Sequence, residues 1–328
     1  MLPTHARFPD VPLGKGHYES FYLKACNPSE PVGLWIRYTV HKHSNKPLQG
    51  SLWFTLFDRN ADGPLAAKVT TPDVTSPEGG YIEIGDSTFG HGAVTGHATT
   101  DQLDASWDLS FATDEEPLLH LSRDWMYRAP VPKTKLLTPY PGARLNGVVR
   151  AGNREVHLDG WRGMIGHNWG SQHAERWIWL HGACFEDAED AWLDAAIGRI
   201  KLGLVTTPWI GNGTLYLDGV RHRLAGPERA RGTRVTESPP RCDFLLPGPE
   251  VTVSGRVESD PKNFVGWVYA DPDGPDHNTV NCSVADMTLT VSADGRPDRE
   301  LRVRGGAAYE LGMREKDHGM PLQPFPDG

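Results

Sequence analysis

Hydrophobic and polar residues alternate with a period of two along much of this chain. The segment 34–41 is an example, because its even-numbered positions are Leu34, Ile36, Tyr38 and Val40, and its odd-numbered positions carry indole, guanidinium, hydroxyl and imidazole groups. Successive side chains of a strand point to opposite faces, so this pattern predicts a β-strand. The same pattern recurs in short runs at 51–57, 81–84, 106–111, 118–122, 176–185, 191–204, 214–217, 250–257, 264–269, 279–291 and 301–303.

Helical periodicity is missing over any long stretch, and Gly, Pro, Asp or Asn residues separate nearly all of these runs. Strands bounded in this way are typical of sandwiches and barrels, whose closure also protects edge strands. The sequence therefore predicts an all-β protein.

The segment 129–142 contains four prolines, which lack a backbone donor and fix φ, so it is expected to be a linker rather than an interior strand. It would divide the chain into an N-terminal β domain, residues 1–128, and a C-terminal β domain, residues 143–328.

The segment 159–181 holds four of the 11 tryptophans and three of the 14 histidines. Its first half is rich in glycine, which places His167 and Trp169 near a bend. In its second half Trp177, Trp179 and His181 share one face of a predicted strand, opposite two aliphatic residues. An aromatic and imidazole face is unusual toward water, so we expect it to line a cavity.

Trp192 and Asp194 share a face of the next predicted strand. A carboxyl group walled by indoles loses hydration, which would raise its pKa and make it a general acid. Indole faces could also stabilise a cationic intermediate. The alternative is structural, because tryptophan-rich strands also fill barrel cores and Asp194 could simply be solvated or paired in a salt bridge.

Composition narrows the class of protein. A net charge of −9 argues against a nucleic-acid partner. No run approaches the ~18 apolar residues of a membrane span, so stable membrane insertion is not expected. With no apolar export signal and four widely spaced cysteines, we expect a cytoplasmic protein with free thiols. No cysteine cluster, phosphate-binding loop or dinucleotide motif is present, so neither a metal nor another cofactor is expected. The oligomeric state stays open.

Four motifs together resemble a known group, the lipocalin-like family of carotenoid hydratase (hydroxyneurosporene synthase) and AttH-like bacterial proteins. They are Pro132–Pro141, Gly166-His-Asn-Trp-Gly170, Trp177-Ile-Trp179 and Trp192-Leu-Asp194. The resemblance implies two tandem lipocalin-like antiparallel β-barrels, without a common cofactor. The family includes hydratases, terpenoid cyclases and pericyclic cyclases.

By this resemblance, the hydratases' His-x-Trp and aromatic-x-Asp motifs fall on His167, Trp169, Trp192 and Asp194. Two positions depart from the family pattern. Trp192 stands where the hydratases have tyrosine, and Gly166 stands where they tend to carry an acid.

Three functions follow as hypotheses. The first is an enzyme that hydrates, dehydrates or cyclises a lipophilic unsaturated molecule such as a terpenoid or polyketide. Asp194 would be the acid, His167 would position water, and Trp169, Trp177, Trp179, His181 and Trp192 would line the cavity. The second is a non-catalytic carrier of hydrophobic ligands, and the third is a purely structural protein. If the pocket lies between the domains, as ligand sites often do, its lining would also include Trp35, Arg37, Trp107 and Tyr269.

Overall fold

The computed structural model describes residues 4–12 and 14–324, which form 24 β-strands and four single-turn 3-10 helices. The all-β prediction is confirmed, since no α-helix occurs in the described ranges. The chain ends included in the predicted domains, residues 1–3 and 325–328, lie outside the described part. The 3-10 helices are η1 (Phe8–Asp10), η2 (Asp124–Tyr127), η3 (Pro227–Arg229) and η4 (Pro261–Asn263).

The first sheet contains every strand up to β12, and all of its pairings are antiparallel. The strand order is β4-β3-β2-β1-β12-β11-β9-β8-β7-β6-β5, with β10 paired to β11. β3 and β4 pack across onto β8, so the sheet curls around its own core. Its strands are β1 (His17–Cys26), β2 (Val32–Lys42), β3 (Gln49–Asp58), β4 (Leu65–Thr71), β5 (Val74–Thr75), β6 (Gly80–Ile84), β7 (Ser87–Gly90), β8 (Ala93–Thr99), β9 (Asp104–Ala112), β10 (Leu118–Leu119), β11 (Thr134–Ala151) and β12 (Arg154–Gly170).

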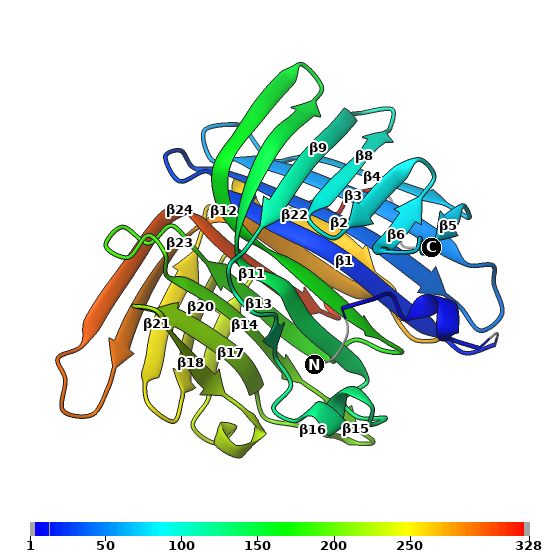
Figure 1. Ribbon diagram of the computed structural model, residues 1–328. Helices are drawn as coiled ribbons and strands as arrows, with labels where there is room; N and C mark the ends of the chain where they lie inside the picture. The colour runs from blue at the N-terminus through cyan, green and yellow to red at the C-terminus, as the bar shows by residue number, and fades with distance from the viewer. Residues whose placement is uncertain (1–3, 13, 325–328) are drawn as a thin grey trace.

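The second sheet has the order β18-β17-β14-β13-β24-β23-β21-β20-β19, with β22 paired to β23. β18 returns to pack beside β20, which nearly closes this barrel. β15 and β16 form a separate two-stranded ribbon. The strands are β13 (Arg176–Gly182), β14 (Trp192–Arg199), β15 (Lys201–Leu202), β16 (Val205–Thr206), β17 (Ile210–Leu217), β18 (Val220–Ala225), β19 (Arg234–Ser238), β20 (Arg241–Pro247), β21 (Thr252–Glu258), β22 (Val265–Tyr269), β23 (His277–Ser292) and β24 (Arg299–Met313). The two sheets adjoin in Figure 1 and fit two tandem lipocalin-like barrels.

The predicted linker is wrong for most of its length, because β11 begins at Thr134 and lies between β12 and β9. Two of its prolines, Pro139 and Pro141, fall where the β11–β12 register shifts, between Leu137 and Tyr140 and between Tyr140 and Ala143. These bulges leave positions where the missing proline donors break no ladder bond. The first sheet therefore continues to Gly170, and the second begins at Arg176.

The junction between the barrels explains why several strands are buried on both faces. In β2, Ile36 and Tyr38 belong to the core of the first barrel, while Trp35 packs into the core shared with the second. β1, β2 and β3 pack against β23. The face of segment 34–41 that carries indole, guanidinium, hydroxyl and imidazole groups is therefore the face that the second barrel covers.

All four cysteines are free thiols, as the sequence predicts. No helix in residues 4–12 and 14–324 is long and apolar enough to cross a membrane.

Candidate functional site

The alternating face of β13 lies at the junction of the two barrels rather than in a barrel lumen. Trp179 meets the ring of Tyr22, a β1 residue, edge to face at 5.7 Å. Ile178 and Leu180, which point the other way, are fully buried in the core of the second barrel. The predicted two-faced strand is present, and its aromatic face packs on the first sheet.

Asp194 lies at the centre of this junction, on β14 beside β13. Its Oδ1 accepts a hydrogen bond from the indole of Trp179 at 3.1 Å, and its Oδ2 accepts one from the hydroxyl of Thr138 at 2.6 Å. The Nε2 of His120 lies 3.3 Å from the same Oδ2. The first sheet thus supplies two of the three groups that hold this carboxylate, and it is 1% exposed.

The expectation of a raised Asp194 pKa is wrong. Burial does favour the neutral form, but His120 and, to a smaller extent, His181 and Thr138 outweigh it, so that the pKa falls to about 2. Asp194 is therefore an ionised hydrogen-bond acceptor at neutral pH and does not carry a proton to donate.

His181 faces Asp194 across the β13–β14 pair, and its ring has no hydrogen bond from either nitrogen. Complete burial, with a further contribution from Lys24, lowers its pKa to about 3, although Asp194 acts in the opposite direction. It is a neutral imidazole next to the ionised carboxylate.

His120 is the functional candidate that the sequence did not reveal. Its Nε2 is also 3.0 Å from the Thr138 hydroxyl, whereas its Nδ1 is buried without a partner. It lines a cavity of about 120 Å³ together with Leu118, Leu119, Gly213, Thr214, Arg221 and Arg223. The segment 118–122 looks like an ordinary short strand, and only its contact with β14 shows its importance.

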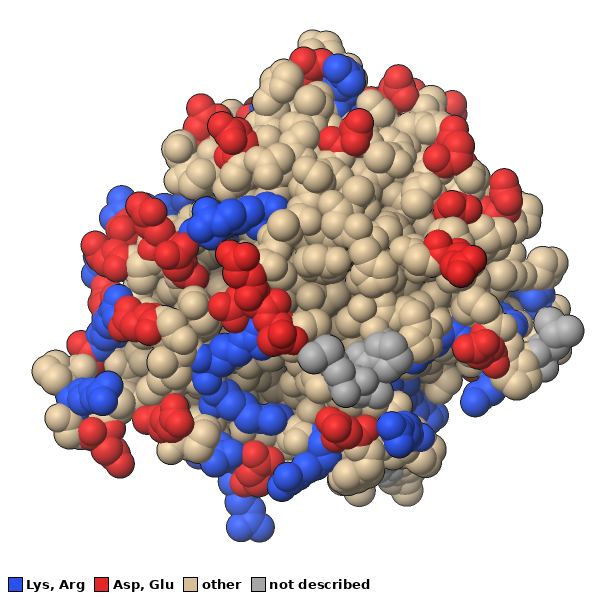
Figure 2. All heavy atoms as spheres, in the orientation of Figure 1, with Lys and Arg blue, Asp and Glu red and all other residues tan. Residues whose placement is uncertain are grey.

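A larger cavity of about 330 Å³ lies along the preceding residues of the same segment. It is lined by Thr4, Thr113, Asp114, Glu115, Glu116, Pro117, Pro139 and Tyr140. We call the cavity beside His120 the inner cavity and the larger one the outer cavity. Arg221, which lines the inner cavity, forms an ion pair at 2.7 Å with Glu115, which lines the outer one. On the face shown in Figure 2, charged side chains gather along the lower and left edges and are sparse over the centre.

His167 does not join Asp194. It is fully buried in the first barrel, where its Nε2 lies 2.7 Å from Oε1 of Glu19 and its ring stacks on Phe21 at 4.3 Å. The carboxylate of Glu19 also accepts the backbone N–H groups of Arg7 and Phe8. His167 therefore helps to hold the N-terminal segment across the barrel, on the sheet face opposite Asp194.

The two other motif tryptophans lie apart from the carboxylate. Trp169 stacks on Tyr127 at 6.1 Å and lies beneath the guanidinium of Arg7. Trp192 stacks on Tyr216 at 5.7 Å, with the guanidinium of Arg221 over its ring. Trp192 thus borders the inner cavity through Arg221.

Three of the four residues proposed for an inter-domain lining do lie at the junction. The guanidinium of Arg37 is 4.2 Å from the ring centroid of Tyr269, and Trp35 packs against Trp267. Trp107 does not line the junction, because it is buried in the first barrel and its indole donates to the hydroxyl of Tyr38. The side chain of Trp107 lies on the face of β9 that points into the first barrel.

Trp177 lies at the far end of the aromatic face of β13. Its indole donates to Glu310 at 2.9 Å, and the hydroxyl of Tyr269 donates to the other oxygen of that carboxylate at 3.1 Å. The aromatic face of β13 therefore contacts two separate buried carboxylates, Asp194 through Trp179 and Glu310 through Trp177.

Gly166, where the hydratases tend to carry an acid, makes room for Tyr22. Any Cβ at Gly166 would overlap the Tyr22 ring. We expect Gly166→Ala to lower the free energy of unfolding by about 2 kcal/mol, a typical cost of overpacking. Urea denaturation would measure it. Gly63→Ala is the matched control, since a Cβ there meets nothing closer than 3.6 Å; equal stability of the two variants would contradict this packing.

Comparison with known proteins places this geometry in a fold group. An AttH-like protein from Nitrosomonas europaea superimposes with a TM-score of 0.57, 13% identity and coverage of 95% of this chain and 98% of that one. Kievitone hydratase from Nectria haematococca gives 0.52, 10% identity and 92% and 89% coverage. CghA with Sch210972 gives 0.50, 14% identity and 91% and 88% coverage. The chain has the lipocalin-like fold of the carotenoid hydratase and AttH-like proteins.

The proteins that resemble this chain in sequence do not indicate an activity. Uncharacterised proteins from two strains of Mycobacterium tuberculosis are each 25% identical over 304 residues, which is 91% of this chain and 87% of the relative. No family model matches the chain.

Proposed function

We propose that the protein is an enzyme of the hydratase, dehydratase or cyclase type that acts on a lipophilic unsaturated small molecule, such as a terpenoid or polyketide. The reaction would take place at the barrel junction, with proton transfer by His120 and Asp194. The observation that carries the proposal is the buried carboxylate–imidazole pair whose imidazole lines a cavity.

Asp194 and His120 suit general acid–base catalysis. A carboxylate that accepts from one ring nitrogen orients the imidazole and balances its positive charge when it is protonated. The other nitrogen, Nδ1, can then give a proton to an alkene carbon and later take one back from water or from the adjacent carbon. Asp194 carries the negative charge that balances protonated His120, and His120 transfers the proton. These roles replace the acid role first expected for Asp194.

The two cavities offer a place for the substrate. Typical ligand pockets measure roughly 300–1,000 Å³, so the inner cavity alone holds only the reacting end of a ligand. Separation of the Arg221–Glu115 ion pair would join it to the outer cavity. The side chains of Leu118 and Leu119 give the inner part an apolar wall.

The fold supports the choice of reaction class. One structural neighbour is kievitone hydratase, and another, CghA, was crystallised with Sch210972. A non-catalytic carrier is the competing hypothesis. The first barrel is filled by aromatic and aliphatic side chains, so a carrier would have to use the junction as well.

Product analysis in ¹⁸O-labelled water tests the proposal. Purified protein is incubated with a panel of terpenoid and polyketide alkenes, and the products are analysed by mass spectrometry. Hydration would add one labelled oxygen, dehydration would remove water, and cyclisation would give an isomer of unchanged mass. Ligands that bind, as judged by tryptophan fluorescence, and are all recovered unchanged would contradict an enzymatic role.

A further inference from the structure

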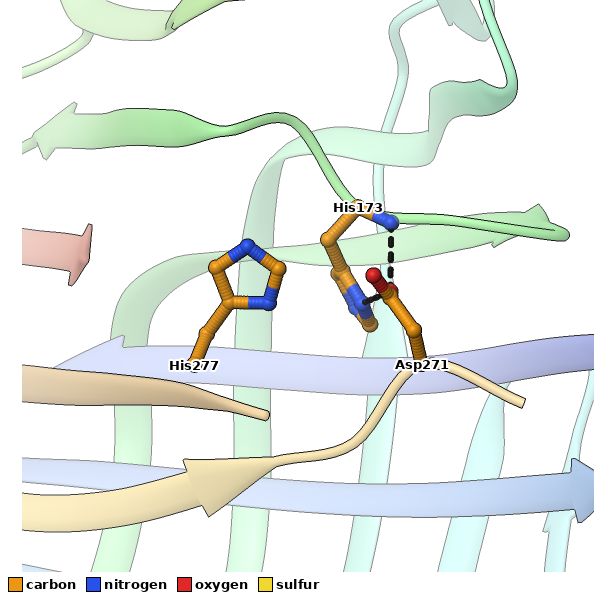
Figure 3. Close-up of side chains that lie close together, drawn as sticks. All are labelled: His173, Asp271 and His277. Atoms are coloured by element: carbon orange, nitrogen blue, oxygen red, sulfur yellow. Dashed lines mark hydrogen bonds and ion pairs between the residues drawn. The ribbon is translucent and has the colours of Figure 1, made fainter. Parts of the chain in front are cut away.

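A second cluster of titratable side chains lies at the barrel junction, separate from Asp194. It contains His173, from the segment between β12 and β13, Asp271, two residues after the end of β22, and His277, the first residue of β23 (Figure 3). Each residue offers one possible ligand atom, and these atoms all lie within 4.8 Å of one another. The proposed reaction uses none of the three.

Asp271 fixes the orientation of His173. Its Oδ1 accepts from the backbone N–H of His173 at 2.7 Å and from the ring Nδ1 at 2.8 Å, as the dashed lines in Figure 3 show. Nδ1 and Oδ1 are therefore nearly as close to each other as two ligands of one metal ion. The ring is held further by stacking on Tyr18 at 4.0 Å.

Several buried polar atoms of the cluster have no hydrogen-bond partner. They are Nε2 of His173, Oδ2 of Asp271 and both ring nitrogens of His277. Leaving such atoms unsatisfied is unfavourable, and two imidazoles with one carboxylate are the kind of ligands that a cation binds.

We propose that His173, Asp271 and His277 bind a divalent first-row transition-metal ion such as Zn²⁺. Two imidazoles and one carboxylate are a common ligand set for these metals and leave at least one coordination position for water. Nδ1 of His173 and Oδ1 of Asp271 would both bind the ion, which would take the place of the proton they share, and a ring nitrogen of His277 would be the third ligand. This arrangement departs from the expectation of no metal, because His173 lies 98 residues from Asp271 and the three residues form no recognisable sequence motif.

Two opposite charges lie at the cluster. Asp271 supplies a carboxylate. The guanidinium of Arg314 acts on His277, but it donates to the carbonyls of Pro275 and Asp276 and lies 3.4 Å from the carboxylate of Glu175. Ligands of a tetrahedral zinc ion lie about 3.4 Å apart, so binding would draw the 171–175 segment toward β22 and β23 and tie the two barrels together.

Zinc titration of chelator-treated protein against a chromophoric competitor tests the site. We expect one Zn²⁺ per chain and at least a 100-fold weaker affinity in His277→Gln. Glutamine is a neutral polar residue of similar length, so this variant should keep the fold of the metal-free protein, as circular dichroism would show. His157→Gln is the matched control, because its exposed imidazole also lies beside a carboxylate, 2.9 Å from Glu155, and its affinity should equal the wild type's.

Asp271→Asn provides a second variant that keeps an acceptor for the ring of His173, and we expect it to weaken binding as well. Co²⁺ added in place of zinc should give visible d–d absorption in the wild type that both variants lack. The site would be refuted by a wild-type protein that binds no stoichiometric zinc, or by affinity that neither variant changes.

Discussion

Acidification from pH 7 to pH 3 is expected to lower the free energy of unfolding by roughly 7 kcal/mol through His181, Glu19 and Asp194 alone. The pKa of His181 falls to about 3 in the folded protein. Below pH 6.5 the unfolded chain therefore binds a proton at His181 that the folded chain does not bind. The carboxyl groups of Glu19 and Asp194 have pKa values of about 2 when folded, so their contribution is present above their unfolded pKa and is lost as pH falls. By linkage, His181 contributes roughly 4 kcal/mol of this loss and the two acids together roughly 3 kcal/mol.

Urea denaturation at a series of pH values would measure this dependence. His181→Gln should flatten the slope between pH 6 and pH 4 by about 1.4 kcal/mol per pH unit, the value for one proton. His157→Gln, at an exposed position, should leave the slope unchanged. Wild-type stability that stays constant down to pH 4 would show that His181 is not the buried neutral imidazole of this fold.

Asp194→Asn is expected to lower turnover by about 10²–10⁴-fold, the range of a general acid–base contribution. The amide oxygen can still accept from Trp179 or Thr138, but it neither orients His120 with a full charge nor stabilises its protonated form. Steady-state kinetics on the substrate found by product analysis would measure kcat and KM separately. We expect the variant to lower kcat and to change ligand binding little, because the hydrogen-bond partners of Asp194 cover it and it does not line the cavity itself.

Circular dichroism and thermal melting provide the control for this variant. Glu310→Gln removes the charge of another buried carboxylate of the junction, held by Trp177 and Tyr269. It should disturb packing to a comparable degree without a comparable loss of kcat. If both variants lose turnover equally, the effect comes from the junction's packing and not from Asp194.

The strands that alternate in sequence were predictable, because local side-chain periodicity alone determines which residues share a face. Trp177, Trp179 and His181 do share a face of β13. The proline-rich start of β11 was not predictable, since bulges in its pairing with β12 accommodate Pro139 and Pro141, and pairing is a property of distant residues.

The candidate site was predictable only in part for the same reason. The sequence singled out Asp194, but its charge state depends on His120 and Thr138, which β14 meets only after the two barrels pack. The family resemblance assigned His167 a catalytic role, and Trp107 was assigned to the lining of an inter-domain pocket. Strand register turns both into the first barrel. Side-chain direction relative to a second sheet cannot be inferred from one strand's pattern.

The central claim is that proton transfer takes place at the junction and not inside the first barrel. The most direct test compares kcat/KM of His120→Gln with that of His167→Gln, at a temperature where melting curves show both variants folded. The structure predicts at least a 100-fold loss for His120→Gln and less than a 10-fold change for His167→Gln. The opposite ranking, with His167 essential and His120 dispensable, would contradict it.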